Sequence, residues 1–180
     1  MNWFMNILIS SKITKIQSEL EEKYSKKYKI LKAEVKSKER QYGLISRIYE
    51  LIPTAIVLGL EKNKREEELI VVLDIGSASN YLYLFGRNYQ GLMNLPRIIF
   101  DINCNDEVKY IHIVDVIMED NCIGNGSIAM TFLIDFARKF EVKYISGSFS
   151  TVDDNHAERR EHFYRKFGFE IRDRKIRLDL

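Results

Sequence analysis

A buried strand followed directly by a glycine turn and a helix constrains the fold of this chain more than any other feature. The run Tyr110–Met118 is apolar and rich in β-branched residues, interrupted only by His112 and Asp115, which predicts a buried strand. Gly124 and Gly126 come next. Apolar residues then recur at spacings of three and four and predict a helix over 125–140; they are Ile128, Ala129, Phe132, Leu133, Phe136, Ala137 and Phe140.

The N-terminus of this predicted helix (its head) favours the binding of an anion. Its first backbone N–H groups have no partner inside the helix, and they lie at the positive end of the helix dipole. Glycine also lets a phosphate approach the backbone closely. A dinucleotide fingerprint would need a longer glycine pattern, and a P-loop would need Gly-Lys-Ser/Thr; the sequence has neither. A structural glycine cap is the alternative for Gly124 and Gly126.

Two segments, in this order, resemble motifs of the GNAT acyltransferases, the Gcn5-related N-acetyltransferase superfamily. Val116, followed by Asn121-Cys122-Ile123-Gly124-Asn125-Gly126, resembles motif A, in which a strand valine precedes Arg/Gln-x-x-Gly-x-Gly/Ala and a helix. Phe163-Tyr164-Arg165-Lys166-Phe167-Gly168-Phe169 resembles motif B, a helix that ends Tyr-x-Lys-x-Gly-Phe. The resemblance covers roughly residues 107–180. It departs at Asn121, where the family usually has Arg or Gln, which removes charge or reach toward a diphosphate.

The resemblance implies an acetyl-CoA-dependent N-acetyltransferase that transfers an acyl group to a primary amine by direct attack in a ternary complex, without a metal. Backbone groups around Val116 and Met118 would hold the pantetheine arm, and those from 121 to 127 the diphosphate. The cofactor-binding residues implied in this way are Val116, Met118, Asn121, Ile123, Gly124, Asn125, Gly126, Ser127 and Asn155.

Tyr164 and His112 are the candidate catalytic residues. By resemblance, Tyr164 matches the tyrosine that protonates the leaving thiolate; the alternative is a core aromatic residue. The glutamate base of the histone-acetylating branch corresponds to Tyr110, which cannot serve as a base near neutral pH. His112 shares its strand face, and imidazole can accept a proton directly or through water. The alternative for His112 is a hydrogen-bonded histidine within the sheet.

The first third of the chain predicts one long helix from Ser10 or Ser11 to Ile52, with a break near Gly43 as an option and a stop at Pro53. Its apolar residues form a narrow stripe among lysines, glutamates and serines, which fits a coiled coil, a solvated helix or a helix lying across its own domain. The stripe consists of Ile13, Ile16, Leu20, Tyr24, Tyr28, Leu31 and Val35. A homodimer through this helix is one expectation.

The rest of the chain predicts a mixed sheet. Strands at 55–60, 69–75, 81–85 and 96–102 are joined by short turns, which favours an antiparallel meander. A strand at 143–149 follows by a right-handed crossover, then a helix at about 155–167 and a closing hairpin of 169–172 with 176–180. We therefore expect an α/β protein (an α+β mixed sheet) with helices on both faces and a GNAT-like fold, divided into 1–53 and 54–180.

Composition narrows the alternatives. The net charge of +2, with acids interleaved among the lysines, gives no reason to expect nucleic acid. Two cysteines outside metal or redox spacing, and no secretion signal, favour a reducing cytoplasm. The apolar start at residues 1–9 is too short to span a bilayer. The family's helices between its first two strands are missing, and Asn121 departs from the motif. A second hypothesis is therefore a non-catalytic coiled-coil interaction protein with a degenerate GNAT-like domain.

Overall fold

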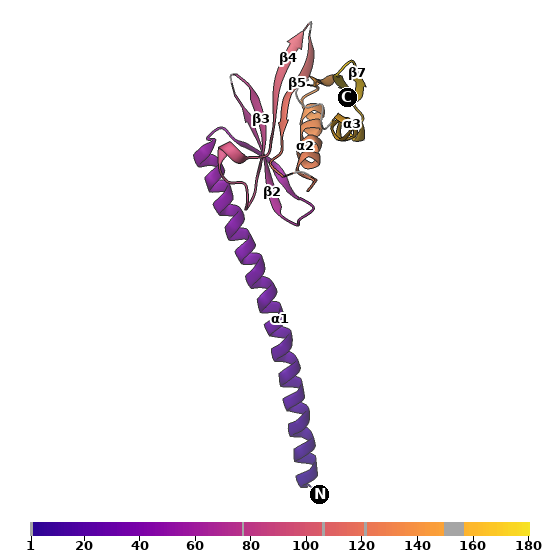
Figure 1. Cartoon of the computed structure of the whole chain (residues 1–180). Coiled ribbons are helices and arrows are strands. Elements are labelled where there is room, and N and C mark those ends of the chain that lie inside the picture. The colour runs from indigo at the N-terminus through magenta and orange to yellow at the C-terminus, as the bar shows by residue number, and fades with distance from the viewer. Residues whose placement is uncertain (1, 77, 106, 121, 150–156) are drawn as a thin grey trace. The chain divides into compact units, whose positions relative to one another are not determined.

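The computed structural model describes residues 2–76, 78–105, 107–120, 122–149 and 157–180, with side chains from residue 15 onward. The chain forms two compact units, Met1–Ile45 and Ser46–Leu180. The first unit consists of most of helix α1, Asn2–Leu51, which is continuous (Figure 1). The second unit contains the last turns of α1 and all of the sheet.

Two details predicted for the long helix are wrong. Helix α1 begins at Asn2, so Ser10 and Ser11 lie inside it rather than capping it. Serine is tolerated within helices, so it marks a start only where the chain before it leaves the helix. Gly43 does not break α1 either. A single glycine costs a helix about 1 kcal/mol, which the surrounding turns of a long helix can offset.

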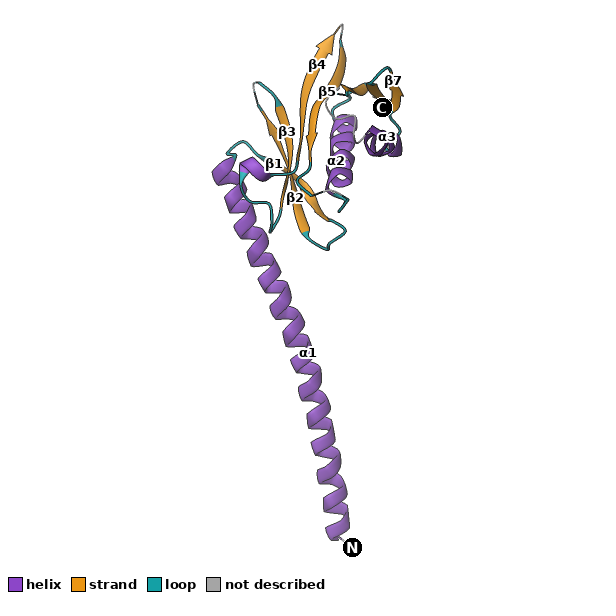
Figure 2. Ribbon diagram, viewed as in Figure 1, coloured by secondary structure: helices purple, strands orange, loops and turns teal. Residues whose placement is uncertain are grey.

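The second unit is built on one mixed sheet of eight strands in the order β1-β2-β3-β4-β5-β6-β8-β7 (Figure 2). The strands are β1 Ile56–Lys62, β2 Glu68–Ile75, β3 Asn80–Phe85, β4 Arg97–Asn105, β5 Val108–Ile117, β6 Tyr144–Ser148, β7 Glu170–Arg172 and β8 Lys175–Asp179. The helices are α2 Asn125–Lys139 and α3 Ala157–Lys166, with a 3₁₀ turn η1 at Leu92–Asn94.

The topology confirms the predicted antiparallel meander, because β1 to β5 pair antiparallel with their sequence neighbours. Strands β5 and β6 are parallel and joined through α2, as predicted for a crossover. Strands β7 and β8 form the closing hairpin. The α+β class with a mixed sheet and a long N-terminal helix is therefore confirmed.

Helix α2 covers one face of the sheet. The Phe136 ring lies 6.3 Å from the Phe100 ring of β4, and Phe132 lies against Gly59 of β1. The last turns of α1, residues 46–51, lie across the strands from α2 in Figure 2, and Ile48 is fully buried there. None of the described helices is both long enough and apolar enough to cross a membrane.

Candidate functional site

Strand β5 bends where the sequence predicts the pantetheine-binding strand. Ile113 pairs with Phe100, but Asp115 pairs with Ile99, so Val114 is an extra residue on β5. Such a bulge bends a strand and increases its twist. The second half of β5 is therefore turned relative to the first half.

Beyond this bulge, β5 leaves its parallel neighbour. Within the described residues, the pairing of β5 with β6 ends at Ile113 opposite Gly147, although β5 continues to Ile117. Strand β6 instead ends against the closing hairpin, where the Phe149 N–H donates to the Arg174 carbonyl at 2.8 Å. Residues 115–117 of β5 thus keep their antiparallel partners on β4, while the segment 114–117 has no described strand on its other edge.

Helix α2 is the next element after this edge, and its N-cap makes no side-chain hydrogen bond. Gly124, the N-cap, has φ 96°, a left-handed conformation that a residue with a Cβ rarely adopts. The first helical hydrogen bond runs from the Ile128 N–H to the Gly124 carbonyl at 3.0 Å. The N–H groups of residues 125–127 are therefore the donors that a helix start leaves without helical partners.

A lysine from α3 lies at the same helix start. The Lys166 ammonium donates to the Ser127 hydroxyl oxygen at 3.0 Å. A Cβ on Gly126 would lie 3.3 Å from the Phe163 ring and 3.7 Å from Met118 Cγ. The end of β5, the head of α2 and the side of α3 therefore meet around Gly126.

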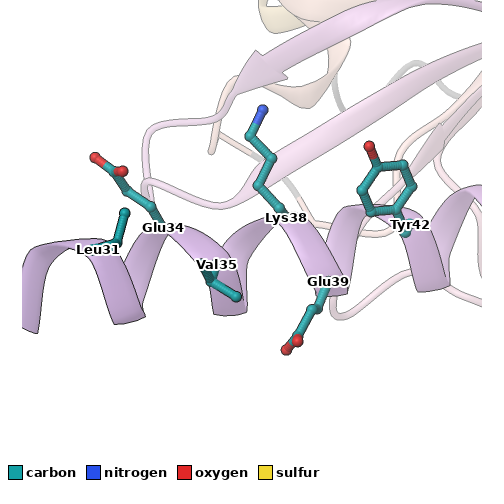
Figure 3. Close-up of a pocket in the computed structure, with 6 residues that line it drawn as sticks. All are labelled: Leu31, Glu34, Val35, Lys38, Glu39 and Tyr42. Atoms are coloured by element: carbon teal, nitrogen blue, oxygen red, sulfur yellow. The ribbon is translucent and has the colours of Figure 1, made fainter. Parts of the chain in front are cut away.

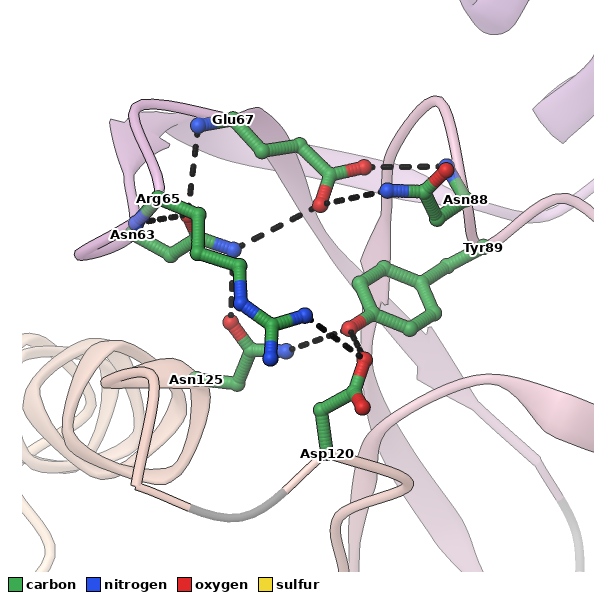
Figure 4. Close-up of polar contacts among 7 residues, drawn as sticks. All are labelled: Asn63, Arg65, Glu67, Asn88, Tyr89, Asp120 and Asn125. Carbon is green, nitrogen blue, oxygen red and sulfur yellow. Dashed lines mark hydrogen bonds and ion pairs between the residues drawn. The ribbon is translucent and has the colours of Figure 1, made fainter.

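A buried polar network holds the other side of the α2 head (Figure 4). Asn125, only 1% exposed, accepts a hydrogen bond from Asn63 Nδ2 at 3.2 Å and donates to the Tyr89 hydroxyl at 3.3 Å. The Tyr89 hydroxyl in turn donates to Asp120, whose carboxylate also faces Arg65 Nη1 at 3.9 Å. This arrangement leaves the buried amide of Asn125 with partners on both its oxygen and its nitrogen.

The same network organises the β1–β2 turn. The Asn63 side-chain oxygen accepts from the N–H groups of Arg65, at 2.9 Å, and Glu67, at 3.1 Å. The Glu67 carboxylate accepts both the backbone and the side-chain N–H groups of Asn88, at 2.9 and 3.2 Å. Lys64 adds a backbone bond, from its N–H to the Ile123 carbonyl at 2.8 Å. The loop before α2 is thus tied to two loops that are distant in sequence.

Tyr164 on α3 lies in an aromatic cluster beside the divergence of β5 and β6. Its ring is 5.5 Å from that of Phe149, at the end of β6, and 5.3 Å from that of Phe169. Burial, and secondarily the negative charge of Asp115, raise the pKa of Tyr164 to about 12, although Arg160 opposes the shift. The Tyr164 hydroxyl therefore keeps its proton at neutral pH, and the residue is also part of the core.

His112 lies on the other face of β5. Ile111 and Ile113 are buried on the α2 side, so the alternation of the strand places His112 opposite. His112 Nδ1 is 3.2 Å from the Ser146 hydroxyl, which donates to the Ile111 carbonyl at 3.3 Å. The structure therefore does not bring His112 to the head of α2; along β5 it is about 13 Å from Val116.

The predicted cofactor residues form two groups. Val116 and Met118 lie at the open end of β5, and the segment 123–127 leads into α2. Asn121 and Asn155 fall outside the described residues. Asp115, which is not among the predicted cofactor residues, accepts the Val116 N–H at 2.7 Å and so occupies one donor of the predicted pantetheine strand.

The sequence reasoning missed the residues that position the loop before α2. Asn63, Glu67, Tyr89 and Asp120 come from three separated loops, and no spacing links them. Asn63 is 4% exposed and Tyr89 5%, which no local pattern indicates. One local pattern points to part of this network. The run Asn-Lys-Arg-Glu-Glu between two strands is typical of a turn in which the asparagine side chain accepts backbone N–H groups of the turn.

Comparison with known proteins places the chain among its relatives. No family model matches it. The uncharacterized protein YocC of Bacillus subtilis (strain 168) is 30% identical over 132 residues, which are 72% of this chain and 76% of that protein. An alignment of this length includes most of the sheet-containing unit whatever its exact bounds. The chain therefore belongs to the same family as YocC.

Proposed function

We propose that this protein is an acetyl-CoA-dependent N-acetyltransferase of the GNAT type. The observation that carries the proposal is the edge of β5 at 114–117, which has no strand partner among the described residues and precedes the start of α2 at Asn125, where the N-cap makes no side-chain hydrogen bond. An exposed strand edge pairs with any extended chain that offers amide groups. The pantetheine arm of coenzyme A carries two amides, and its diphosphate follows them toward the helix start.

The diphosphate would lie at the head of α2. The N–H groups of 125–127 point out of the helix start, and the Lys166 ammonium lies beside Ser127. Together they supply hydrogen-bond donors and positive charge, as anion sites at helix starts do. The network around Asn125 holds these donors in place before the cofactor arrives, which lowers the cost of binding.

Tyr164 would act as the general acid. The amine attacks the thioester carbonyl carbon, the carbon–sulfur bond breaks, and the thiolate of coenzyme A leaves with the electron pair. The Tyr164 proton then passes to this sulfur. The hydroxyl is protonated at neutral pH, as a general acid requires. The pKa raised by burial also makes it a weaker acid than a free phenol, so the phenolate regains a proton from solvent water as the thiol forms.

The proton released by the amine would reach His112 through water. Since the Ser146 hydroxyl donates to Ile111, its oxygen is free to accept the Nδ1–H of His112. Nε2 of the neutral imidazole then carries the lone pair that accepts a proton. His112 lies on the face of β5 opposite α2, so this route places the acceptor amine on that face.

The second candidate function is a non-catalytic interaction protein with a degenerate domain. The Phe163 ring, 3.3 Å from a Cβ position on Gly126, favours it, because this side chain partly occupies the space beside the α2 head. The described chain between β1 and β5 also carries only strands and the short turn η1, where the GNAT family has helices. The helices that the GNAT family carries between its first strands therefore have no counterpart in this part of the described chain.

A thermal-shift titration with acetyl-CoA separates the two functions. At about a hundred times its Kd, the cofactor stabilises the fold by about 2.7 kcal/mol. Gly126→Glu abolishes the shift through steric overlap and negative charge. Gly91→Glu is the matched control, because a Cβ there meets nothing within 4 Å, and its shift equals that of the wild type. No shift for the wild-type protein at millimolar acetyl-CoA contradicts the enzyme and favours the second function.

A further inference from the structure

Helix α1 exposes a continuous apolar stripe. Six large side chains on one face are each 50–66% exposed: Ile16, Leu20, Tyr24, Tyr28, Leu31 and Val35. Their spacings of four, four, four, three and four residues keep them on one side of a helix with about 3.6 residues per turn. An exposed stripe of this length marks an interaction surface.

The surface of this stripe has the form that receives a helix. Figure 3 shows a hollow on α1 lined by Leu31, Glu34, Val35, Lys38, Glu39 and Tyr42. Leu31, Glu34, Val35 and Lys38 have the spacing i, i+3, i+4, i+7, which is the four-residue hole of coiled-coil packing. Val35, Lys38, Glu39 and Tyr42 repeat this spacing one turn later. The hollow therefore consists of two adjacent holes for the knobs of a facing helix.

We propose that the segment 16–42 of α1 pairs antiparallel with the same segment of a second copy of this chain. Leu20 and Ile16 of one copy fill the two holes of the other copy. This inference is independent of the proposed enzymatic activity, because all its residues lie in the first compact unit.

The order of the apolar residues favours self-pairing in this direction. From Leu20 to Val35 the stripe has nearly the same spacing in either direction, so over this part an antiparallel copy presents apolar residues opposite apolar residues. Leu20 then faces Val35 of the second copy, Tyr24 faces its Leu31, and Tyr28 faces Tyr28 near the two-fold axis. The stripe advances 19 residues in five steps, a mean spacing of about 3.8 that exceeds the 3.6 residues per helical turn, so the pair does not follow the left-handed supercoil of a heptad repeat.

The charges beside the stripe disfavour the parallel alternative. The residues on either side of the apolar stripe form two flanks. In a parallel, in-register pair, a residue on one flank of a helix lies beside the residue about five positions later on the other flank of the partner helix. Lys27 would then meet Lys32, and Glu34 would meet Glu39, two contacts between like charges. Both contacts would occur twice by symmetry.

In the antiparallel pair, each flank lies beside the same flank of the second copy, and the charges there are complementary. Glu21 of one copy then lies beside Lys32 of the other, and Lys23 lies beside Glu34. One contact between like charges remains, Lys27 with its own copy near the axis. The balance of two favourable kinds of pair against one unfavourable contact selects the antiparallel direction.

Sedimentation equilibrium of the full chain tests the pairing. The wild-type protein sediments with twice the mass of one chain, and Leu20→Glu gives the mass of one chain. Ile30→Glu is the matched control: Ile30 is 62% exposed but lies off the stripe, so this variant stays a dimer. A wild-type monomer overturns the proposal, as does the loss of the dimer in both variants. Circular dichroism confirms that each variant stays folded.

Two further variants test the direction. Lys32→Glu weakens the antiparallel dimer, because it places a carboxylate beside Glu21; in a parallel dimer it would relieve the contact with Lys27 and strengthen association. Glu21→Lys combined with Lys32→Glu restores the dimer. Strengthening by Lys32→Glu alone overturns the antiparallel assignment.

Cross-linking gives an independent readout. The exposed Cys104 and Cys122 are first replaced by serine, so that only the introduced thiols can react. A mixture of Leu20→Cys and Val35→Cys chains then forms the disulfide-linked pair, and Leu20→Cys alone does not link to itself. Self-linking of Leu20→Cys overturns the antiparallel direction.

Discussion

At the residue scale, the start of α2 combines an exposed lysine side chain with backbone N–H donors. Lys166 reaches Ser127 from α3, and its side chain is exposed enough to turn toward a ligand. The backbone N–H groups of 125–127 are fixed by the helix. The distinction matters because a side chain can be changed without altering the fold.

Lys166→Glu therefore tests the charge of the site. It replaces a cation beside the proposed diphosphate position with an anion, and the lost charge-assisted contact would cost about 1.5–3 kcal/mol. We expect the Kd for coenzyme A, measured by calorimetry, to rise at least tenfold. Lys139→Glu, at the C-terminal end of α2 and so far from the helix start, leaves the Kd unchanged. Equal Kd values for coenzyme A in the two variants would show that Lys166 does not contribute to binding.

Tyr164→Phe separates the two roles of this residue. The variant keeps the ring packing but lacks the proton, so turnover falls while the Kd for acetyl-CoA stays within about twofold. Release of free coenzyme A thiol in the presence of an amine panel measures turnover. Unchanged turnover would leave Tyr164 as a core residue only.

The same variant changes the alkaline stability of the protein. Burial raises the pKa of Tyr164 to about 12, above the value of about 10 in the unfolded chain. Its contribution to folding is fully present below pH 10 and is lost as the pH rises from 10 toward 12. Tyr164→Phe should therefore reduce the alkaline loss by roughly 2 kcal/mol, measured by urea unfolding between about pH 9 and pH 12. An identical loss in both proteins would contradict the assigned burial.

Asn125→Ala tests the buried network. It removes the acceptor of Asn63 Nδ2 and the donor to Tyr89, so we expect the free energy of unfolding to fall by about 1–3 kcal/mol. Denaturant unfolding measures the change. Gln90→Ala, beside Tyr89 on the β3–β4 loop, is the control, because the Gln90 side chain donates to the nearby Arg87 carbonyl. Comparable losses for the two variants would show that the network adds little.

At the element scale, α1 is one helix through Gly43, although Ser10, Ser11 and Gly43 each predicted an end or a break. A Cβ on Gly43 would meet nothing within 4 Å. Gly43→Ala should therefore stabilise the helix locally by about 1 kcal/mol. Slower amide exchange in the surrounding turns measures this gain. Faster exchange there would mean that α1 is not continuous at Gly43.

The strands were largely predictable because each carries a short β-branched run between turn residues. The run Leu69–Ile75 differs from β2 by one residue, and the closing hairpin turns at Asp173 and Arg174, one residue shorter than the predicted turn over 173–175. The bulge at Val114 was not predictable, because it depends on the pairing partners of β4. The network around Asn125 was hidden for the same reason: its partners come from distant loops, whose meeting only the sheet order determines.

At the scale of the whole molecule, the account rests on a continuous binding path from the open edge of β5 to the head of α2. The separate first unit carries the proposed pairing stripe and no part of this path. Cofactor binding and self-association are therefore expected to be independent. Leu20→Glu should give a monomer that binds coenzyme A with the affinity of the wild-type protein, measured by calorimetry. A much weaker affinity would show that the two are coupled.

Hydrogen exchange with and without coenzyme A tests the binding path most directly. The account predicts slower exchange of the amides at 114–118 and 125–127 when the cofactor is bound, because the open strand edge and the helix start then have partners. Exchange in the stripe of α1 stays unchanged. Unchanged exchange at both segments with saturating coenzyme A, or protection confined to another part of the sheet, would contradict the account.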